Sequence, residues 1–416
     1  MPKIKIEGKH TLTGTINISG AKNSAVALIP ASILCDEEVT INNVPNISDI
    51  DSLEEILLSL NAKISRNEEE IKINSFNIIN TKIEEELSKK LRASYYFMGA
   101  LLGKFKKVDM YFPGGCVIGE RPINLHLKGF EELGATITED GNHFIIEAKE
   151  LKGSKIYLDI PSVGATINIM LAAVKAKGKT YIKNAAKEPE IVNVATFLNN
   201  MGAKIKGAGT NVIVIEGVDY LHSCFHEVIP DRIEAGTFVI VGALLGDNLK
   251  INNIIPSHIE ALTLKLKEAG VNMEINDDNI VISKGENLKA IDIETLVFPG
   301  FPTDLQQTII PFLTQCEGES KVRETIYENR FQNIPDTIKM GADIDIIDNQ
   351  FAIVKGKTLL HGEEVVATDL RGGASMLICG LIAEGITVVD NIHFILRGYD
   401  NIVEKLSNVG AKIELI

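Results

Sequence analysis

The residues best suited to chemistry in this chain lie in the segment from Pro113 to Pro122, PGGCVIGERP. It places a thiol, Cys116, five residues before a guanidinium, Arg121, in a run that glycines and prolines make unfit for helix or strand. A thiol can donate a proton or act as a nucleophile, and a guanidinium binds phosphate or carboxylate. Taken alone, a surface loop with an incidental cysteine is the simpler interpretation, so the rest of the chain must decide.

Arginine is scarce in this chain, which makes the positions of the few arginines informative. Lys and Arg together number 42, and eight of them are Arg, which leaves 34 lysines. Where a lysine-rich chain still uses arginine, planar bidentate recognition of phosphate or carboxylate is favoured, with a buried Arg–carboxylate pair as the structural alternative. Six of the eight lie at junctions between the repeated units described next: Arg92, Arg121, Arg232, Arg330, Arg371 and Arg397.

The elements that must position these residues form a repeat of about 70 residues that recurs six times. Each unit has an apolar helix rich in small residues, such as VGATINIMLAAVKAKG, then a short β-type run, an amphipathic helix closed by glycine, and two short strands. The pattern predicts α/β units of order βαβαββ whose apolar helices are buried on every side. Three units could bury their apolar helices together, so six units predict two domains.

The predicted domain boundary follows from the ends of the chain. The sixth unit stops at Ile416 without its final strands, and the extended run KIKIEGKHTLTGTINISG near the N-terminus can supply them. We therefore expect one domain over residues 22–229 and a second made of residues 1–21 and 230–416.

Polar and cationic residues gather at the predicted starts of the apolar helices, where unpaired N–H groups and the helix dipole attract anions. Ser, Thr and Asp at such places are commonly simple N-caps, but cations are disfavoured there, so the arginines and lysine need an anionic partner. We expect an anionic small molecule in a cleft between the two domains. The residues at these starts are Lys22, Asn23, Arg92, Ser94, Ser162, Gly164, Thr166, Asp231, Arg232, Thr303, Asp304, Asp369 and Arg371.

Composition excludes several other classes of function. The formal net charge of −14 argues against sequence-independent binding to nucleic acid or to an anionic membrane. The five cysteines are scattered and lack CxxC spacing, so neither a disulfide framework nor a zinc site is expected, and we expect no cofactor. Apolar runs such as the one from Phe238 are far shorter than the roughly 20 residues of a membrane span. With no secretory leader before Lys3, the expected location is cytoplasmic.

The segments that carry these residues resemble the enolpyruvyl transferases, from end to end of the chain. The matching motifs are SGAKNSA, LRAS, PGGCVIGERPINLH, PSVGATINIM, EPEIVN, PDRIEAGT, FPTDLQ, ENRF, DLRGGAS and LRGYDN. The resemblance implies a two-domain inside-out α/β barrel with three repeated units in each domain and the active site in the cleft between them. It also implies transfer of enolpyruvate from phosphoenolpyruvate to the 3′-hydroxyl of UDP-N-acetylglucosamine with release of phosphate, through a tetrahedral addition–elimination intermediate. That reaction is the first committed step of peptidoglycan synthesis.

The same resemblance implies a role for each motif residue. Cys116 would protonate the methylene carbon, Asp304 would be the base for the 3′-hydroxyl, and Lys22 and Arg397 complete the expected catalytic set. Lys22, Arg121 and Arg397 would hold the phosphate and carboxylate of phosphoenolpyruvate. The further substrate contacts that it implies are Asn23, Arg92, Ser162, Val163, Gly164, Arg232, Ile326, Arg330, Asp369 and Arg371. Some relatives carry lysines for the uridine nucleotide at two positions that are uncharged here, Ser48 and Ile160.

Three alternatives remain beside this prediction. The sister transferase that acts on shikimate 3-phosphate shares the fold and the arginines, but its loop has no cysteine equivalent to Cys116. A thiol hydrolase could pair Cys116 with His126, although the sequence shows no third group to orient the histidine. A non-catalytic six-repeat protein could use the same arginines only to bind an anionic ligand.

Overall fold

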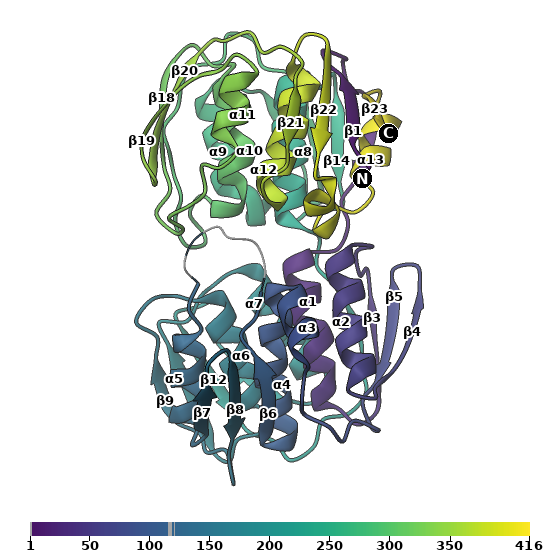
Figure 1. Cartoon of the computed structure of the whole chain (residues 1–416), viewed down its shortest axis with the longest axis vertical. Coiled ribbons are helices and arrows are strands. Elements are labelled where there is room, and N and C mark those ends of the chain that lie inside the picture. The colour runs from purple at the N-terminus through teal and green to yellow at the C-terminus, as the bar shows by residue number, and fades with distance from the viewer. Residues whose placement is uncertain (1, 115–118, 120) are drawn as a thin grey trace. The chain divides into compact units, whose positions relative to one another are not determined.

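The computed structural model describes residues 2–114, 119 and 121–416, which form two compact units (Figure 1). The N-terminal unit contains residues 20–114 and 121–229, and the C-terminal unit contains residues 2–19, 119 and 230–416. The chain therefore crosses between the units at residues 19–20 and 229–230. Cys116 lies outside the described residues.

In the N-terminal unit, three sheets flank three buried helices. Strands such as β3 alternate between buried and exposed residues, which places one face of each sheet on the core. In order across each sheet, the strands are β13 (Phe225–Glu227), β3 (Glu38–Asn42), β5 (Glu70–Asn74) and β4 (Lys63–Asn67); β6 (Lys107–Tyr111), β8 (His143–Glu147) and β7 (Thr136–Asp140); and β11 (Lys204–Lys206), β12 (Val212–Glu216), β10 (Lys179–Lys183) and β9 (Lys155–Tyr157).

The buried helices of this unit consist almost entirely of apolar and small residues, as the sequence predicts. They are α1 (Lys22–Ala31) with η1 (Ser32–Leu34), α4 (Tyr96–Phe105), and α6 (Val163–Ala173). Short segments α3 (Glu85–Lys90) and η2 (Arg92–Tyr95) precede α4, and the outer amphipathic helices are α2 (Ser48–Ser59), α5 (Asn124–Glu132) and α7 (Pro189–Asn200). Helices α4 and α6 run in the same direction and are in close contact at two glycines of α4. A Cβ atom at Gly99 would lie 2.3 Å from the Asn168 carbonyl oxygen, and one at Gly103 would lie 2.8 Å from the Leu171 carbonyl oxygen.

The C-terminal unit repeats this plan. Its sheets are β15 (Met273–Ile275), β16 (Asn279–Ile282), β14 (Leu249–Asn252) and β2 (Thr15–Asn17); β17 (Ile293–Glu294), β18 (Gly318–Arg323), β20 (Phe351–Gly356) and β19 (Asp343–Asp348); and β21 (Glu364–Val366), β22 (Ile386–Asp390), β1 (Ile4–Glu7) and β23 (Lys412–Leu415). The buried helices are α8 (Arg232–Leu245), α10 (Gln306–Leu313) and α12 (Leu370–Ile382). Around them lie α9 (Glu260–Glu268), α11 (Ile334–Lys339), α13 (Ile402–Asn408), η3 (Pro256–Ile259), η4 (Thr303–Leu305) and η5 (Ile392–Arg397).

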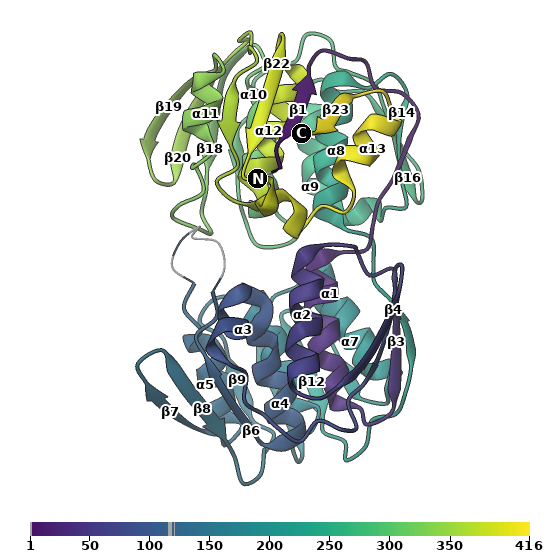
Figure 2. The same cartoon turned by 45° about the vertical axis from the view of Figure 1, so that its right-hand side comes forward.

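The predicted βαβαββ repeat and its buried helices are confirmed, with one exception. In the second repeat the first strand is reduced to a single parallel bridge between Lys82 and Asp109, so its sheet has three strands where the others have four. The N-terminal run contributes one strand to the sixth repeat, because β1 lies between β22 and β23 (Figure 2). The expectation that both final strands of this repeat are missing is wrong, because β23 lies at the end of the chain itself. The Lys3 amide donates to the Ile416 carbonyl at 2.8 Å, which ties the two chain ends together.

In each unit, one strand belongs to the segment that directly precedes the first buried helix of the other unit. Strand β2 precedes α1 but pairs in parallel with β14 of the C-terminal unit, and β13 precedes α8 but pairs in parallel with β3 of the N-terminal unit. Each of these two crossings is thus preceded by a strand in a sheet of one unit and followed by a buried helix of the other unit. None of the helices in the described part of the chain combines the length and apolar composition that a membrane span needs.

Candidate active site

The predicted substrate residues of the N-terminal unit lie at one end of it. The C-terminal ends of its three buried helices meet at one cavity, which Leu34, Gly103 and Lys175 help to line. Their starts therefore lie together at the opposite end of the unit. Those starts carry Lys22 and Asn23 on α1, Arg92 on η2, and Ser162, Val163 and Gly164 at α6.

Lys22 at the start of α1 forms a buried ion pair. Its Nζ lies 2.8 Å from Oδ2 of Asp49, and the side chains are 12% and 7% exposed. Asp49 is in the first turn of α2, where the helix dipole favours a carboxylate. The sequence argument that this cation needs an anionic partner is right, but the protein itself supplies one.

A second cluster joins Arg92 to the start of α6. The Arg92 guanidinium lies 5.9 Å from the centroid of the Tyr95 ring, and that ring packs edge-on against His126. A Cβ atom at Gly164 would lie 2.9 Å from both the His126 ring and the Tyr95 hydroxyl, so glycine is needed for this packing. The cluster therefore fixes Arg92 and the α6 start relative to each other.

The same cluster argues against His126 as the base of a thiol hydrolase. Burial, with a smaller contribution from Arg92, lowers the pKa of His126 to about 3, and its Nδ1 accepts a hydrogen bond from the Asn168 amide at 2.9 Å. A ring with that pKa is a weak base, because efficient general bases have pKa values near the working pH. His126 is a packed core histidine in this structure.

In the C-terminal unit, one carboxylate holds two arginines. Asp304 Oδ1 lies 2.9 Å from Arg330 Nη2, and its Oδ2 lies 3.1 Å from Arg371 Nη2. Burial alone would raise the pKa of Asp304, but Arg371 and Arg330 together hold it well below its usual range. Arg330 also donates to the Thr303 carbonyl at 2.8 Å, which fixes the turn that carries Asp304. Three predicted residues, Asp304, Arg330 and Arg371, are thus in direct contact.

Other polar residues at helix starts act as caps. The Ser162 hydroxyl accepts from the Ala165 amide, and the Asp231 carboxylate accepts from two amides at the start of α8. Asp369 Oδ1 accepts from the Arg371 amide at 2.9 Å, and its Oδ2 accepts from the Gln307 side chain at 2.9 Å. The capping interpretation of these residues is confirmed.

Sequence reasoning missed Glu324, a buried carboxylate beside the turn of Asp304 that is 1% exposed. Its Oε1 accepts from Thr295 Oγ1 at 2.9 Å and from the Ile326 and Tyr327 amides at 2.8 and 3.1 Å. Its Oε2 accepts from Thr303 Oγ1 at 2.9 Å, beside Asp304. A signal was present, since Glu324 follows β18 in the same alternation that buries Ser320 and Val322.

Four predicted residues occupy less enclosed positions. Arg121, Arg232, Ile326 and Arg397 are half-buried; Arg232 begins α8 with its guanidinium 5.7 Å from the Phe298 ring, and Arg397 ends η5. Cys116, the predicted acid, lies outside the described residues.

Comparison with known proteins assigns the family. The family model for EPSP synthase (3-phosphoshikimate 1-carboxyvinyltransferase) matches residues 6–406. The chain belongs to the enolpyruvyl transferase family. A protein of Bacillus cereus named UDP-N-acetylglucosamine 1-carboxyvinyltransferase 2 is 54% identical over 99% of this chain and 96% of its own length. Proteins of the same name from Geobacillus kaustophilus and Bacillus subtilis are 52% and 51% identical over the same shares.

Solved structures of enolpyruvyl transferases agree with the fold described above. The enolpyruvyl transferase NikO from Streptomyces tendae superposes with a TM-score of 0.90 at 25% identity, covering 100% of this chain and 99% of its own. EPSP synthase from Acinetobacter baumannii superposes with a TM-score of 0.76 at 18% identity, covering 100% of both chains. The latter likeness concerns the fold alone. The predicted two-domain α/β architecture of the enolpyruvyl transferases is therefore confirmed.

Proposed function

We propose that this enolpyruvyl transferase transfers the enolpyruvyl group of phosphoenolpyruvate to the 3′-hydroxyl of UDP-N-acetylglucosamine and releases phosphate. The observation that carries the proposal is the 51–54% identity, over 99% of the chain, to relatives named for that reaction. The reaction opens peptidoglycan synthesis, and its expected setting is the cytoplasm, where both small-molecule substrates are made. The shikimate 3-phosphate alternative has weaker support, because the EPSP synthase structure is only 18% identical.

The arginine cluster suits a substrate with several negative charges. Addition of the sugar hydroxyl to the enol carbon requires a proton on the methylene carbon and loss of the hydroxyl proton. Elimination then removes a proton from the new methyl group and expels phosphate. Arg330 and Arg371 would stabilise the phosphate as it leaves, since a planar guanidinium group can donate two parallel hydrogen bonds to one phosphate. Lys22, Arg92, Arg121 and Arg397 would contribute further positive charge, and Cys116 would supply the proton.

The role of Asp304 as a base then depends on the arginines. With both guanidinium groups on it, its pKa is far too low to take a proton from a hydroxyl. A substrate phosphate or carboxylate that takes over Arg330 or Arg371 would remove the cause of that depression and raise the pKa of Asp304. Asp304 would thus keep the two arginines in place before substrate arrives and become a base after it.

The remaining predicted contacts are assigned to UDP-N-acetylglucosamine. Asn23 would contact the sugar, and Ser162, Val163, Gly164 and Arg232 would line the nucleotide. Ile326 would lie against the substrate, and Asp369 would act mainly through the α12 start that it caps.

Phosphate release measured with both substrates, and with each alone, tests the reaction. We expect release only when phosphoenolpyruvate and UDP-N-acetylglucosamine are both present. Release that instead requires shikimate 3-phosphate would overturn the proposal, and no release with any acceptor would favour the non-catalytic alternative.

For Cys116→Ala we expect turnover to fall by roughly 10² to 10⁴ with substrate binding retained.

A matched pair of arginine variants tests the site. Arg371→Lys keeps the positive charge but loses the planar guanidinium group that donates to Asp304, and we expect kcat/KM to fall by about 10²-fold or more. Arg323→Lys makes the same chemical change at an exposed position on β18 and should leave kcat/KM unchanged. Equal effects of the two variants would remove Arg371 from the site.

A further inference from the structure

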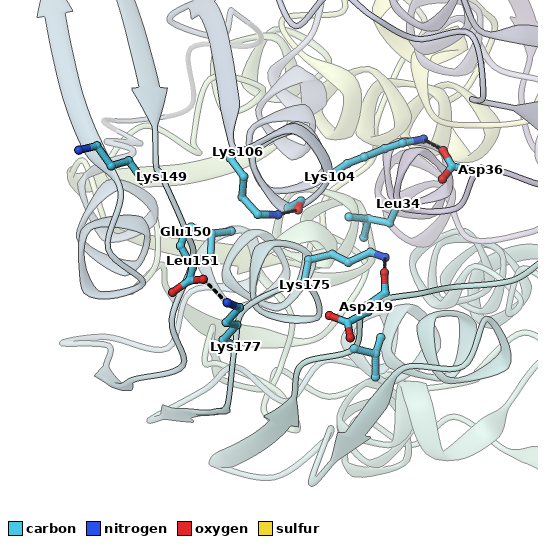
Figure 3. Close-up of a pocket in the computed structure, with 12 residues that line it drawn as sticks. Leu34, Asp36, Lys104, Lys106, Lys149, Glu150, Leu151, Lys175, Lys177 and Asp219 are labelled. Carbon is cyan, nitrogen blue, oxygen red and sulfur yellow. Dashed lines mark hydrogen bonds and ion pairs between the residues drawn. The ribbon is translucent and has the colours of Figure 1, made fainter.

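A second cationic site lies in the N-terminal unit, at the end opposite the helix starts (Figure 3). It is a cavity of about 380 Å³ between the C-terminal ends of the buried helices, with Leu34, Gly103 and Leu151 among its lining residues. Five lysines line it: Lys104, Lys106, Lys149, Lys175 and Lys177. They come from two different repeats and from the strand connection after β8, so the cluster is made by the fold and not by one basic stretch of sequence.

Positive charge is in excess in this cavity. Lys104, Lys106, Lys175 and Lys177 share it with three carboxylates, those of Asp36, Glu150 and Asp219, which leaves one positive charge in excess; the Lys149 side chain points away from these groups (Figure 3). Lys104 Nζ lies 2.8 Å from Asp36 Oδ1, and Lys177 pairs with Glu150.

Two of the lysines, Lys106 and Lys175, are half-buried. Lys106 donates to the Gly103 carbonyl and Lys175 to the Asp219 carbonyl, so both ammonium groups are hydrogen-bonded to the backbone. Burial lowers the pKa of both amines, and the charge of Lys175 lowers the pKa of Lys106 further. An anion between them would oppose both effects.

Lysines at helix C-terminal ends have a structural explanation, because cations there interact well with the helix dipole. The other unit shows that the fold does not require them. The Lys177 amide, just after α6, donates to the Leu151 carbonyl at 2.8 Å. At the equivalent place after each buried helix of the C-terminal unit, an acidic residue makes the same backbone bond to a leucine: Asp247 to Leu12 at 2.9 Å, Glu317 to Leu288 at 2.7 Å and Glu384 to Leu360 at 2.9 Å.

We propose that this cavity binds a phosphate-bearing small molecule. The lining contains lysines but no arginine among the residues described, and an ammonium group binds phosphate as a point charge. The volume lies within the range of about 300–1,000 Å³ that is typical of small-molecule sites. The site is separate from the candidate active site, and its test does not depend on catalysis.

Calorimetric titration of the full chain with inorganic pyrophosphate at low salt tests the proposal. The double variant Lys106→Gln/Lys175→Gln should weaken one binding event by about tenfold or more, because each lost charged hydrogen bond accounts for about that factor. The matched control Lys63→Gln/Lys155→Gln removes the same charge from exposed strand positions of the same unit and should leave the titration unchanged. Neither double variant changes the arginines of the candidate active site, so pyrophosphate binding there should be unaffected. The binding event that weakens in the Lys106→Gln/Lys175→Gln variant therefore belongs to the cavity.

A third variant guards against misfolding of the double variant. Lys177→Glu installs the type of residue that the C-terminal unit carries at the equivalent position, so it should fold normally by circular dichroism and lose the same binding event. Unchanged pyrophosphate binding in both cavity variants, or equal loss in the Lys63→Gln/Lys155→Gln control, would overturn the proposal. Binding of citrate without binding of pyrophosphate would overturn its phosphate chemistry.

Discussion

Glu324→Ala is the variant that most directly tests how the C-terminal unit positions Asp304. The substitution removes the acceptor of two partly buried amides, those of Ile326 and Tyr327, and of two threonine hydroxyls. The hydroxyls can rotate to other acceptors, but the amides cannot. A fully buried donor left without a partner costs about 1–3 kcal/mol, so the two partly buried amides together put at most about 6 kcal/mol on the segment after β18 and on the Thr303 turn.

That penalty should appear in catalysis as well as in stability. Displacement of the turn by about 1 Å can reduce turnover by about 10²-fold, so we expect kcat for phosphate release to fall by at least about tenfold and the urea midpoint of unfolding to fall with it. Glu324→Gln is the matched control. Its carbonyl oxygen can keep the three bonds made by Oε1, and its amide can donate to Thr303, so we expect kcat within about threefold of the native protein.

Two results would refute this reasoning. If Glu324→Ala has the native kcat and the native urea midpoint, the four hydrogen bonds do not hold the turn. If Glu324→Gln is as damaging as Glu324→Ala, the charge of Glu324 matters and its hydrogen-bond geometry does not.

Three further variants address the N-terminal unit. The unfolded chain takes up a proton on His126 below its ordinary pKa of 6.5, whereas burial lowers the pKa of this group in the folded chain to about 3. The stability that this group contributes is therefore complete above pH 6.5 and is reduced by roughly 3 kcal/mol at pH 4.5, and in His126→Gln that part of the pH dependence of urea unfolding should be missing. Asp49→Asn removes the carboxylate from the buried pair with Lys22 and should destabilise the protein by up to about 3–5 kcal/mol in thermal unfolding. The double variant Lys22→Met/Asp49→Asn should recover part of this loss. An unchanged Tm in Asp49→Asn would show that the pair is not needed for stability. Gly99→Ala places a Cβ atom 2.3 Å from the Asn168 carbonyl and should lower the Tm through overpacking, and a native Tm would mean that α4 and α6 can separate at no cost.

The fold was predictable because its signals are local and repeated. An apolar helix such as α6 must be buried, and a glycine after an amphipathic helix ends it, wherever they occur in the chain. The loss of the first strand of the second repeat was not predictable in this way. The segment around Lys82 pairs through one bridge to Asp109, and α3 begins three residues later at Glu85.

The groups that pair with the cations could not be predicted from the sequence, for a different reason. Lys22 meets Asp49 from another helix, and Arg371 meets Asp304 from 67 residues away. The first pair joins two helices of one repeat and the second joins two repeats, and periodicity carries no information about which side chains meet. The sequence could identify cations in need of a negative charge, but not whether the protein or a ligand provides it.

Acidic residues at helix starts show what the structure adds to a sequence motif. Asp231, Asp304 and Asp369 all lie where a buried helix of the C-terminal unit begins, and by sequence each could be a cap or a catalytic group. Oδ1 of Asp231 and Oδ1 of Asp369 each accept from two backbone amides, and Oδ2 of Asp369 accepts from Gln307. Asp304 is placed otherwise, since both of its oxygens face guanidinium groups. A carboxylate whose partners can be drawn away by a more highly charged anion can change its pKa during a reaction, whereas one that caps a helix cannot do so without unwinding it. Of the three, Asp304 is therefore the one that we propose as the base.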